Sequence, residues 1–145
     1  MSSSSADAAT TFGRAVVIDA GADTLKVGFA GESDPQFTVP NAVAKPKKEL
    51  RLLVGEQTVS GVKDYSSLEY VRPVDRGYIT NWDTQAEIWS QVFDDSHLDI
   101  AERVSELGLL HTTQPFTLPS VLRSMDETVF EKFGFHSFYR CAGAG

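Results

Sequence analysis

The sequence contains a single cysteine, Cys141, among its 145 residues. With one thiol no internal disulfide can form, so the fold cannot depend on a disulfide framework, and a reducing compartment is the natural setting. We expect Cys141 to behave as a small buried residue rather than as a reactive group.

Apolar runs long enough to cross a membrane are missing, and the N-terminal residues lack the charged and apolar regions of a secretory signal. Histidine is scarce as well, and none of the three has a cysteine or carboxylate at metal-ligand spacing. We therefore expect no membrane partner and a structural role for His111, which falls in a short apolar run. The formal net charge of −7 argues against nucleic acid as a partner of the whole surface.

Basic residues are concentrated in one segment of this acidic chain. Lys45, Lys47, Lys48 and Arg51 surround Pro46. They could form a patch for an acidic partner or for nucleic-acid phosphates, or they could belong to a solvated small subdomain rich in loops. Four charges favour the second interpretation, and no sequence-specific contact with nucleic acid is expected.

Small residues separate two apolar, partly β-branched runs at 15–19 and 25–29, a pattern that predicts a tight hairpin. Backbone N–H groups of such a turn can form an anion-binding nest, Asp19 can hold a hydrated divalent cation, and Lys26 can place a point charge on a phosphate. A plain hairpin remains the alternative, because the pattern alone is weakly specific. The candidate nucleotide-binding residues are Asp19, Gly21, Ala22, Asp23, Thr24 and Lys26, with Asp19 as the indirect metal contact.

Two amphipathic helices are predicted after residue 80. The first runs from Thr84 to Phe93 with Asp83 as its N-cap, and the second opens at Pro119 with Thr117 as its cap and ends at Gly134. The apolar stripe of the second helix is expected to face the core. It comprises Val121, Leu122, Met125, Val129, Phe130 and Phe133. Strands are expected at 109–113 and at 135–141.

Four motifs in order resemble landmarks of the actin family. They are DAGADTLKVGFAG at 19–31, VPN at 39–41, RGYITNWD at 76–83 and FEKF at 130–133. The likeness extends from about residue 15 to residue 141. Further segments at 77–85, 114–120 and 124–130 are similar to an actin-related protein of the nucleus rather than to conventional actin.

The resemblance implies an α/β fold, namely an actin-like subdomain of the ribonuclease-H type shared with sugar kinases and heat-shock ATPases. It implies an incomplete first subdomain at 15–32 and 68–145 and a small second subdomain inserted at 33–67. The residues before them, 1–14, begin with a stretch rich in Ser, Ala and Thr without periodicity, which predicts a disordered tail. We expect the chain to stop before the second lobe. Binding of ATP with Mg²⁺ is the implied cofactor chemistry.

The implied function is that of a non-catalytic subunit of a nuclear chromatin-remodelling complex that exchanges a variant histone. Its implied partners are the other subunits of the complex, with histones among them. The alternative is a nucleotide-binding, actin-like cytoskeletal protein, with the cytoplasm as a further location. A shortened segment at 45–55, where actin has a long filament-forming loop, predicts no filament.

Two departures from the family pattern predict that hydrolysis is lost. Ala22 and Asp23 stand where actin has a hydroxyl and a glycine, and Asp23 adds a negative charge near the phosphate. The resemblance also places His136 where the family has the glutamine that orients the attacking water.

Overall fold

The computed structural model describes residues 15–46, 53–55, 57–60, 68–76, 78–114 and 117–142. The predicted tail at 1–14 lies outside these residues. So do Lys47, Lys48, Arg51 and the side chain of Lys45, which leaves the basic cluster a prediction.

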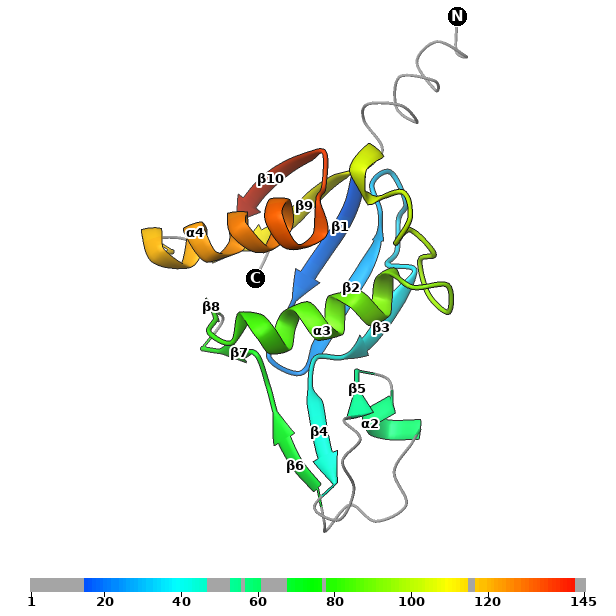
Figure 1. Ribbon diagram of the computed structural model, residues 1–145, viewed down its shortest axis with the longest axis vertical. Coiled ribbons are helices and arrows are strands. Elements are labelled where there is room, and N and C mark those ends of the chain that lie inside the picture. Colours follow the sequence, from blue (N-terminus) through cyan, green and yellow to red (C-terminus); the bar gives the residue numbers. More distant parts are fainter. Residues whose placement is uncertain are drawn as a thin grey trace, which may run out of the picture.

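The larger of two main sheets has five strands in the order β10-β9-β1-β2-β3 (Figure 1). The strands are β1 (Ala15–Ala20), β2 (Thr24–Phe29), β3 (Phe37–Pro40), β9 (Gly108–Thr113) and β10 (Ser137–Ala142). β2 is antiparallel to both β1 and β3, whereas β9 runs parallel to β1 and to β10. The predicted opening hairpin and the predicted strand near 109–113 are confirmed.

Helix α3 (Trp82–Phe93) packs on one face of this sheet. Its N-cap is Asn81, whose side chain accepts a hydrogen bond of 3.1 Å from the backbone N–H of Thr84. The prediction that Asp83 caps the helix is therefore wrong. Because the helix begins two residues earlier than predicted, Asp83 lies in its first turn, where its charge still favours the helix dipole.

Helix α4 (Pro119–Asp126) continues into a π-helical segment, η4 (Glu127–Phe133), which Gly134 ends with φ at 79°. Leu118 occupies the N-cap position, and the hydroxyl of Thr117 instead donates to the carbonyl of Gln114 at 2.6 Å. The predicted cap at Thr117 is thus wrong, because this local turn uses its hydroxyl. The predicted terminator Gly134 is confirmed.

The π-helical segment also changes the predicted apolar stripe. Each turn of a π-helix holds more residues than an α-turn, so a stripe written with α-helical spacing drifts off the buried face. Val129 is buried, but Phe130 is 44% exposed and makes an edge-to-face contact with Phe138 on β10. The core assignment of Phe130 is therefore corrected.

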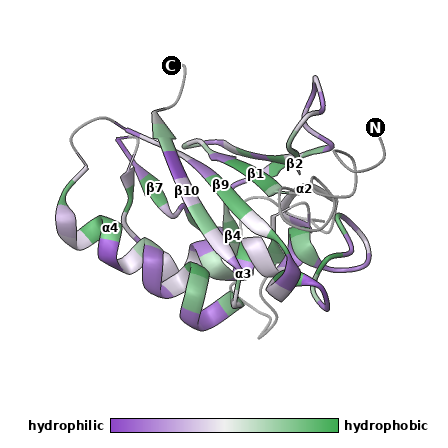
Figure 2. Ribbon diagram, turned by 90° about the horizontal axis from the view of Figure 1, so that it is seen from above, coloured by the Kyte–Doolittle hydropathy of each residue, from purple (hydrophilic) through white to green (hydrophobic). Residues whose placement is uncertain are grey.

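Alternating side chains of the sheet meet the two helices in a single core. Trp89 of α3 lies at its centre, with its ring centroid 6.3 Å from that of Phe93 and 5.8 Å from that of Phe133. Both helices cover this one face, which Figure 2 shows from above. The largest fully buried side chains are Trp89, Phe93, Ile18, Leu25, Ile88, Ile100, Leu109 and Gln85, followed by Val16, Val27, Val39 and Val92.

The opposite face of the sheet carries no helix from the described residues (Figure 2). Arg140 on β10 points to the helices, because its guanidinium bonds Asp126 of α4. Cys141 is the next residue of the strand and lies opposite Thr112, so it points to the other face. The thiol is exposed, so its predicted burial is wrong. Strand alternation, not residue type, decides its environment.

A second, three-stranded sheet has the order β5-β4-β6 and lies beside the first (Figure 1). It contains β4 (Val43–Pro46), β5 (Leu53–Val54) and β6 (Leu68–Val71), with the short helix α2 (Gln57–Ser60) next to β5. A two-stranded ladder of β7 (Val74–Asp75) and β8 (Tyr78–Ile79) leads back to α3. β3 joins the large sheet although it falls within 33–67, and the proposed subdomain boundaries stay predictions.

The observed cap of α3 can be tested by Asn81→Ala. Loss of the side-chain acceptor should lower the free energy of unfolding by about 1 kcal/mol. Asp83→Asn, the matched control, should cost only a few tenths of that amount because it removes a charge and not a cap. Urea unfolding at constant m-value measures both. A larger loss for Asp83→Asn would contradict the assignment of the cap.

Candidate functional site

The β1–β2 turn is closed by a hydrogen bond of 2.9 Å from the N–H of Gly21 to the carbonyl of Thr24. An added Cβ at Gly21 would lie 3.1 Å from that same oxygen, which explains a glycine here. Ala22, Asp23 and Thr24 are exposed at the tip. The turn thus keeps small residues where an anion could approach, but the N–H of Gly21 is already in use.

Asn41 fixes the turn from the inside. Its side-chain Nδ2 donates to the carbonyl of Gly21 and its backbone N–H donates to the carbonyl of Asp23, both at 2.9 Å. Gln85 of α3 donates to Asn41 Oδ1 at 2.8 Å and accepts from Asn41 Nδ2 at 3.3 Å. Both residues are fully buried. This amide pair ties the turn to the end of β3 and to the helix.

Sequence reasoning missed the pair, although one signal was present. Gln85 is a polar residue on the same helical face as Ile88 and Trp89, where only apolar residues are expected. A buried amide needs partners for its donors and its acceptor. Asn41 supplies them from a position 44 residues away in the sequence, which no local pattern indicates.

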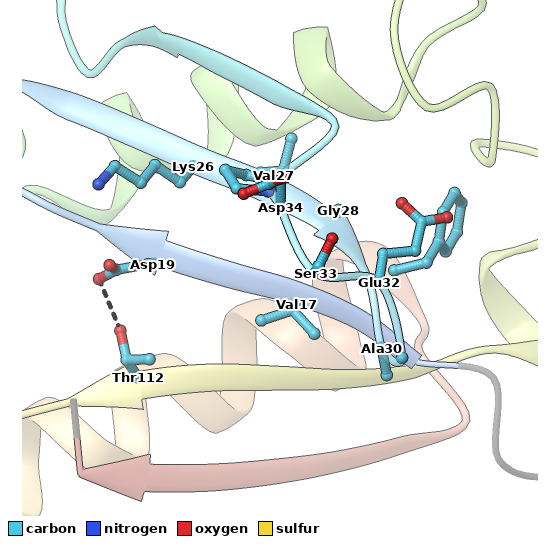
Figure 3. Close-up of a pocket in the computed structure, with 13 residues that line it drawn as sticks. Val17, Asp19, Lys26, Val27, Gly28, Ala30, Glu32, Ser33, Asp34 and Thr112 are labelled. Atoms are coloured by element: carbon cyan, nitrogen blue, oxygen red, sulfur yellow. Dashed lines mark hydrogen bonds between the residues drawn. The ribbon is translucent and has the colours of Figure 1, made fainter. Parts of the chain in front are cut away.

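Asp19 lies near the end of β1, opposite Lys26 on β2. Its Oδ1 accepts a hydrogen bond of 2.8 Å from the hydroxyl of Thr112 on β9. All three residues line one end of a pocket of about 330 Å³, and the side chains of Asp19 and Lys26 extend toward that end together (Figure 3). Thr112 was also missed, because only the parallel pairing of β9 with β1 brings it to Asp19.

The structure divides the six predicted site residues into two groups. Asp19 and Lys26 line the pocket, whereas the turn residues at 21–24 are not part of its lining. Asp23 is 90% exposed and its carboxylate lies 3.6 Å from Arg72. A pair this exposed contributes little energy, but the guanidinium does offset the charge that Asp23 brings to the turn.

His111 is buried beside this site on β9. Its Nδ1 bonds the backbone carbonyl of Thr112, which makes Nδ1 the protonated nitrogen, and its ring lies 5.6 Å from that of Trp89. Burial lowers the pKa of His111 to about 4, against the raising effects of the Thr112 carbonyl and of Asp19. A neutral, enclosed imidazole has the structural role that the sequence predicted.

His136 lies at the opposite end of the strands from Asp19, too far along the sheet for its predicted role. It immediately precedes β10, in which Ser137 is opposite Gly108, and Gly108 is in turn opposite Ala15 at the start of β1. Asp19 is near the other end of β1. The expectation that His136 replaces a water-orienting glutamine is therefore wrong. The residue of β10 that is level with Asp19 is Cys141, which lies opposite Thr112.

Similarity to known proteins covers nearly the whole chain. The family model described as Actin matches residues 12–144. The chain belongs to the actin family. The predicted actin-like fold class, an α/β subdomain, is thereby confirmed.

Curated relatives of the chain are named actin-related protein 6 or actin-like protein ARP6. The chain is 44% identical over 126 residues to actin-related protein 6 of Arabidopsis thaliana, a match that covers 86% of the chain and 29% of the relative. It is 39% identical over 132 residues to that of Neurospora crassa (88% and 29%) and 36% identical over 129 residues to actin-like protein ARP6 of Cryptococcus neoformans (89% and 26%). The chain thus spans under a third of the length of these relatives. The predicted likeness to an actin-related protein is confirmed.

Actin-family proteins generally bind ATP with Mg²⁺, and part of this site fits that ligand. One oxygen of Asp19 is fixed by Thr112, which leaves the second oxygen to face a hydrated cation, and Lys26 adds a positive charge at the same end of the pocket. At the turn, Ala22 offers no hydroxyl to a phosphate. Within the described residues, no cluster of three or more metal-ligating side chains occurs and no helix is long and apolar enough to span a membrane.

Stability should fall in acid because of His111. The unfolded chain binds its proton near pH 6.5, whereas the folded pKa is about 4, so stability present at pH 7 is lost as the pH falls through this window. The loss should reach roughly 3 kcal/mol at pH 4. His111→Gln should remove this part of the pH dependence in urea unfolding, and His136→Gln, at an exposed site, should keep it. An unchanged acid loss in His111→Gln would contradict this origin.

Proposed function

We propose that the protein is a non-catalytic, actin-related subunit of a nuclear chromatin-remodelling complex of the kind that exchanges a variant histone. The observation that carries the proposal is the similarity to actin-related protein 6 along nearly the whole chain, at 44% identity to the Arabidopsis relative. Actin-related protein 6 is generally a subunit of such remodelling complexes. The protein acts through contacts with the other subunits, with histones among its partners.

The geometry of the site supports a role without catalysis. Hydrolysis needs a group that orients or deprotonates the attacking water within hydrogen-bond reach. Beside Asp19 the pocket is lined by Lys26, a cation rather than a base, and by Thr112, whose hydroxyl already donates to Asp19. Asp34 lines the middle of the pocket near Val27 (Figure 3). Glu32 lies at the opposite end of the pocket (Figure 3), and His111 is buried with Nδ1 engaged.

Nucleotide binding, where it occurs, would rest on few groups. Asp19 would hold Mg²⁺ through water molecules, and Lys26 would contact a phosphate oxygen. The turn at Gly21, Ala22, Asp23 and Thr24 would approach the phosphates with its backbone. Mg²⁺ would neutralise phosphate charge, and the bound nucleotide would stabilise the fold rather than react.

Copurification from nuclei tests the proposed partners. The tagged 145-residue chain should recover subunits of a histone-exchange remodelling complex from a nuclear extract, identified by mass spectrometry, at 150 mM salt. The matched control is a scrambled-sequence chain of equal charge with the same tag. Recovery of cytoskeletal proteins in place of remodelling subunits would overturn the proposal.

Asp19→Ala separates the proposal from the cytoskeletal alternative. With Mg-ATP, the wild-type chain and Asp19→Ala should both release inorganic phosphate at the background rate, and neither should pellet on high-speed centrifugation. The reason is that the described site offers no water-activating group near Asp19. Turnover by the wild type that Asp19→Ala abolishes, or pelleting that depends on nucleotide, would establish the actin-like enzyme instead.

A further inference from the structure

Buried amides in a protein core are costly unless every polar atom is paired. Asn41 and Gln85 are fully buried, and together they make two mutual hydrogen bonds. The two remaining bonds of Asn41 go to the β1–β2 turn, at the carbonyls of Gly21 and Asp23. Both hydrogen bonds that Asn41 makes outside the pair are therefore directed to this one turn.

These bonds set the direction of a backbone N–H group. In a planar trans peptide the N–H points away from the carbonyl of the preceding residue. Because the carbonyl of Gly21 points inward to Asn41 Nδ2, the N–H of Ala22 must point outward. The outer side of the turn is where Ala22 and Asp23 are exposed, so a donor faces the solvent where an anion would arrive.

Gln85 and the Gly21 carbonyl together hold the Asn41 amide in one orientation. The Gly21 carbonyl only accepts hydrogen bonds, so it selects Nδ2 and would repel the amide oxygen. Rotation of the Asn41 amide alone would also break both bonds to Gln85, whose Nε2 donates to Asn41 Oδ1 at 2.8 Å and whose Oε1 accepts from Asn41 Nδ2. Helix α3 thereby adds two bonds to the orientation in which Nδ2 faces the turn.

We propose that Asn41 and Gln85 are positioning residues that hold the β1–β2 turn in its anion-facing shape before any ligand binds. The turn is then preorganised by a side-chain pair from the residue after β3 and from α3 rather than by its own residues, among which Ala22 offers no hydroxyl. The positioning itself is independent of ligand binding. Its effect on nucleotide affinity rests on the proposed nucleotide contact.

The test is amide hydrogen exchange, followed by NMR, in the 145-residue chain and in Gln85→Met. Methionine keeps the length and the helix propensity of glutamine but cannot bond Asn41. The amide protons of Gly21 and Asn41 should exchange about tenfold faster in the variant, as loss of a net hydrogen bond predicts. Those of Leu109 and Leu110 on β9 should change less than twofold. Glu87→Gln, at an exposed position of α3, should leave all four unchanged.

Equal acceleration at the turn and on β9 would overturn the proposal, because the pair would then stabilise the whole fold without a particular effect on the turn. No acceleration at the turn would overturn it as well. Should Gln85→Met not fold, Gln85→Asn gives the same comparison, since the amide stays polar but is withdrawn from Asn41 by about 1.5 Å.

Titration with Mg-ATP separates this proposal from the proposed nucleotide contact. Weaker binding by Gln85→Met together with faster exchange at the turn supports both. Faster exchange without any binding by the wild type supports the positioning role and refutes the nucleotide contact. Unchanged exchange with altered binding refutes the positioning role alone.

Discussion

Alternation along β1, at the centre of the large sheet, is the constraint on which the rest of the structure depends. Val16 and Ile18 point to the helices and are completely buried, while Val17 and Asp19 point to the opposite face. A shift of one residue would reverse every side chain and bury Asp19. The parallel partner β9 then places Thr112 beside Asp19, and the antiparallel partner β2 places Lys26 there. The core and the pocket therefore have a common origin.

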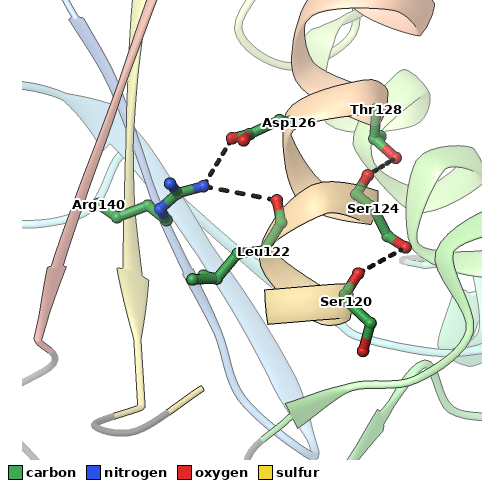
Figure 4. A network of polar contacts seen from close by, with 6 residues as sticks. All are labelled: Ser120, Leu122, Ser124, Asp126, Thr128 and Arg140. Carbon is green, nitrogen blue, oxygen red and sulfur yellow. Dashed lines mark hydrogen bonds and ion pairs between the residues drawn. The ribbon is translucent and has the colours of Figure 1, made fainter. Parts of the chain in front are cut away.

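Much of the fold could be predicted from local patterns. The opening hairpin, the two helices and the terminator Gly134 follow from periodicity and from the conformational preferences of glycine. The first residues of the helices were harder to predict from the sequence. Asn81 and Asp83 are both good capping residues, and the local sequence does not distinguish them. At Phe130 an α-helical period was assumed where the backbone forms a π-helix. Two successive hydroxyl-to-carbonyl bonds, from Ser124 to Ser120 and from Thr128 to Ser124, lead into the first residues of that segment (Figure 4).

The candidate site was predictable only where it is contiguous in sequence. Asp19 and Lys26 belong to one hairpin, so their proximity follows from the turn. Thr112, Asn41 and Gln85 come from three other elements, and their contacts depend on strand order and helix packing. For His136, the dependence on strand direction led to a wrong prediction rather than to a missed residue. Its place in the sequence suggested a role near Asp19, but the direction of β10 puts it at the opposite end of the strands.

The two crossings between the sheets meet at one turn. The chain enters the small sheet just after Asn41 and leaves it at Arg72, and β4 and β6 run side by side between these points. Asn41 donates a hydrogen bond to the Gly21 carbonyl on the inner side of the turn, and Arg72 forms an ion pair with Asp23 on its outer side. The entry to the small sheet and the exit from it therefore both contact the same turn, and that turn joins β1 and β2, the two strands that carry Asp19 and Lys26.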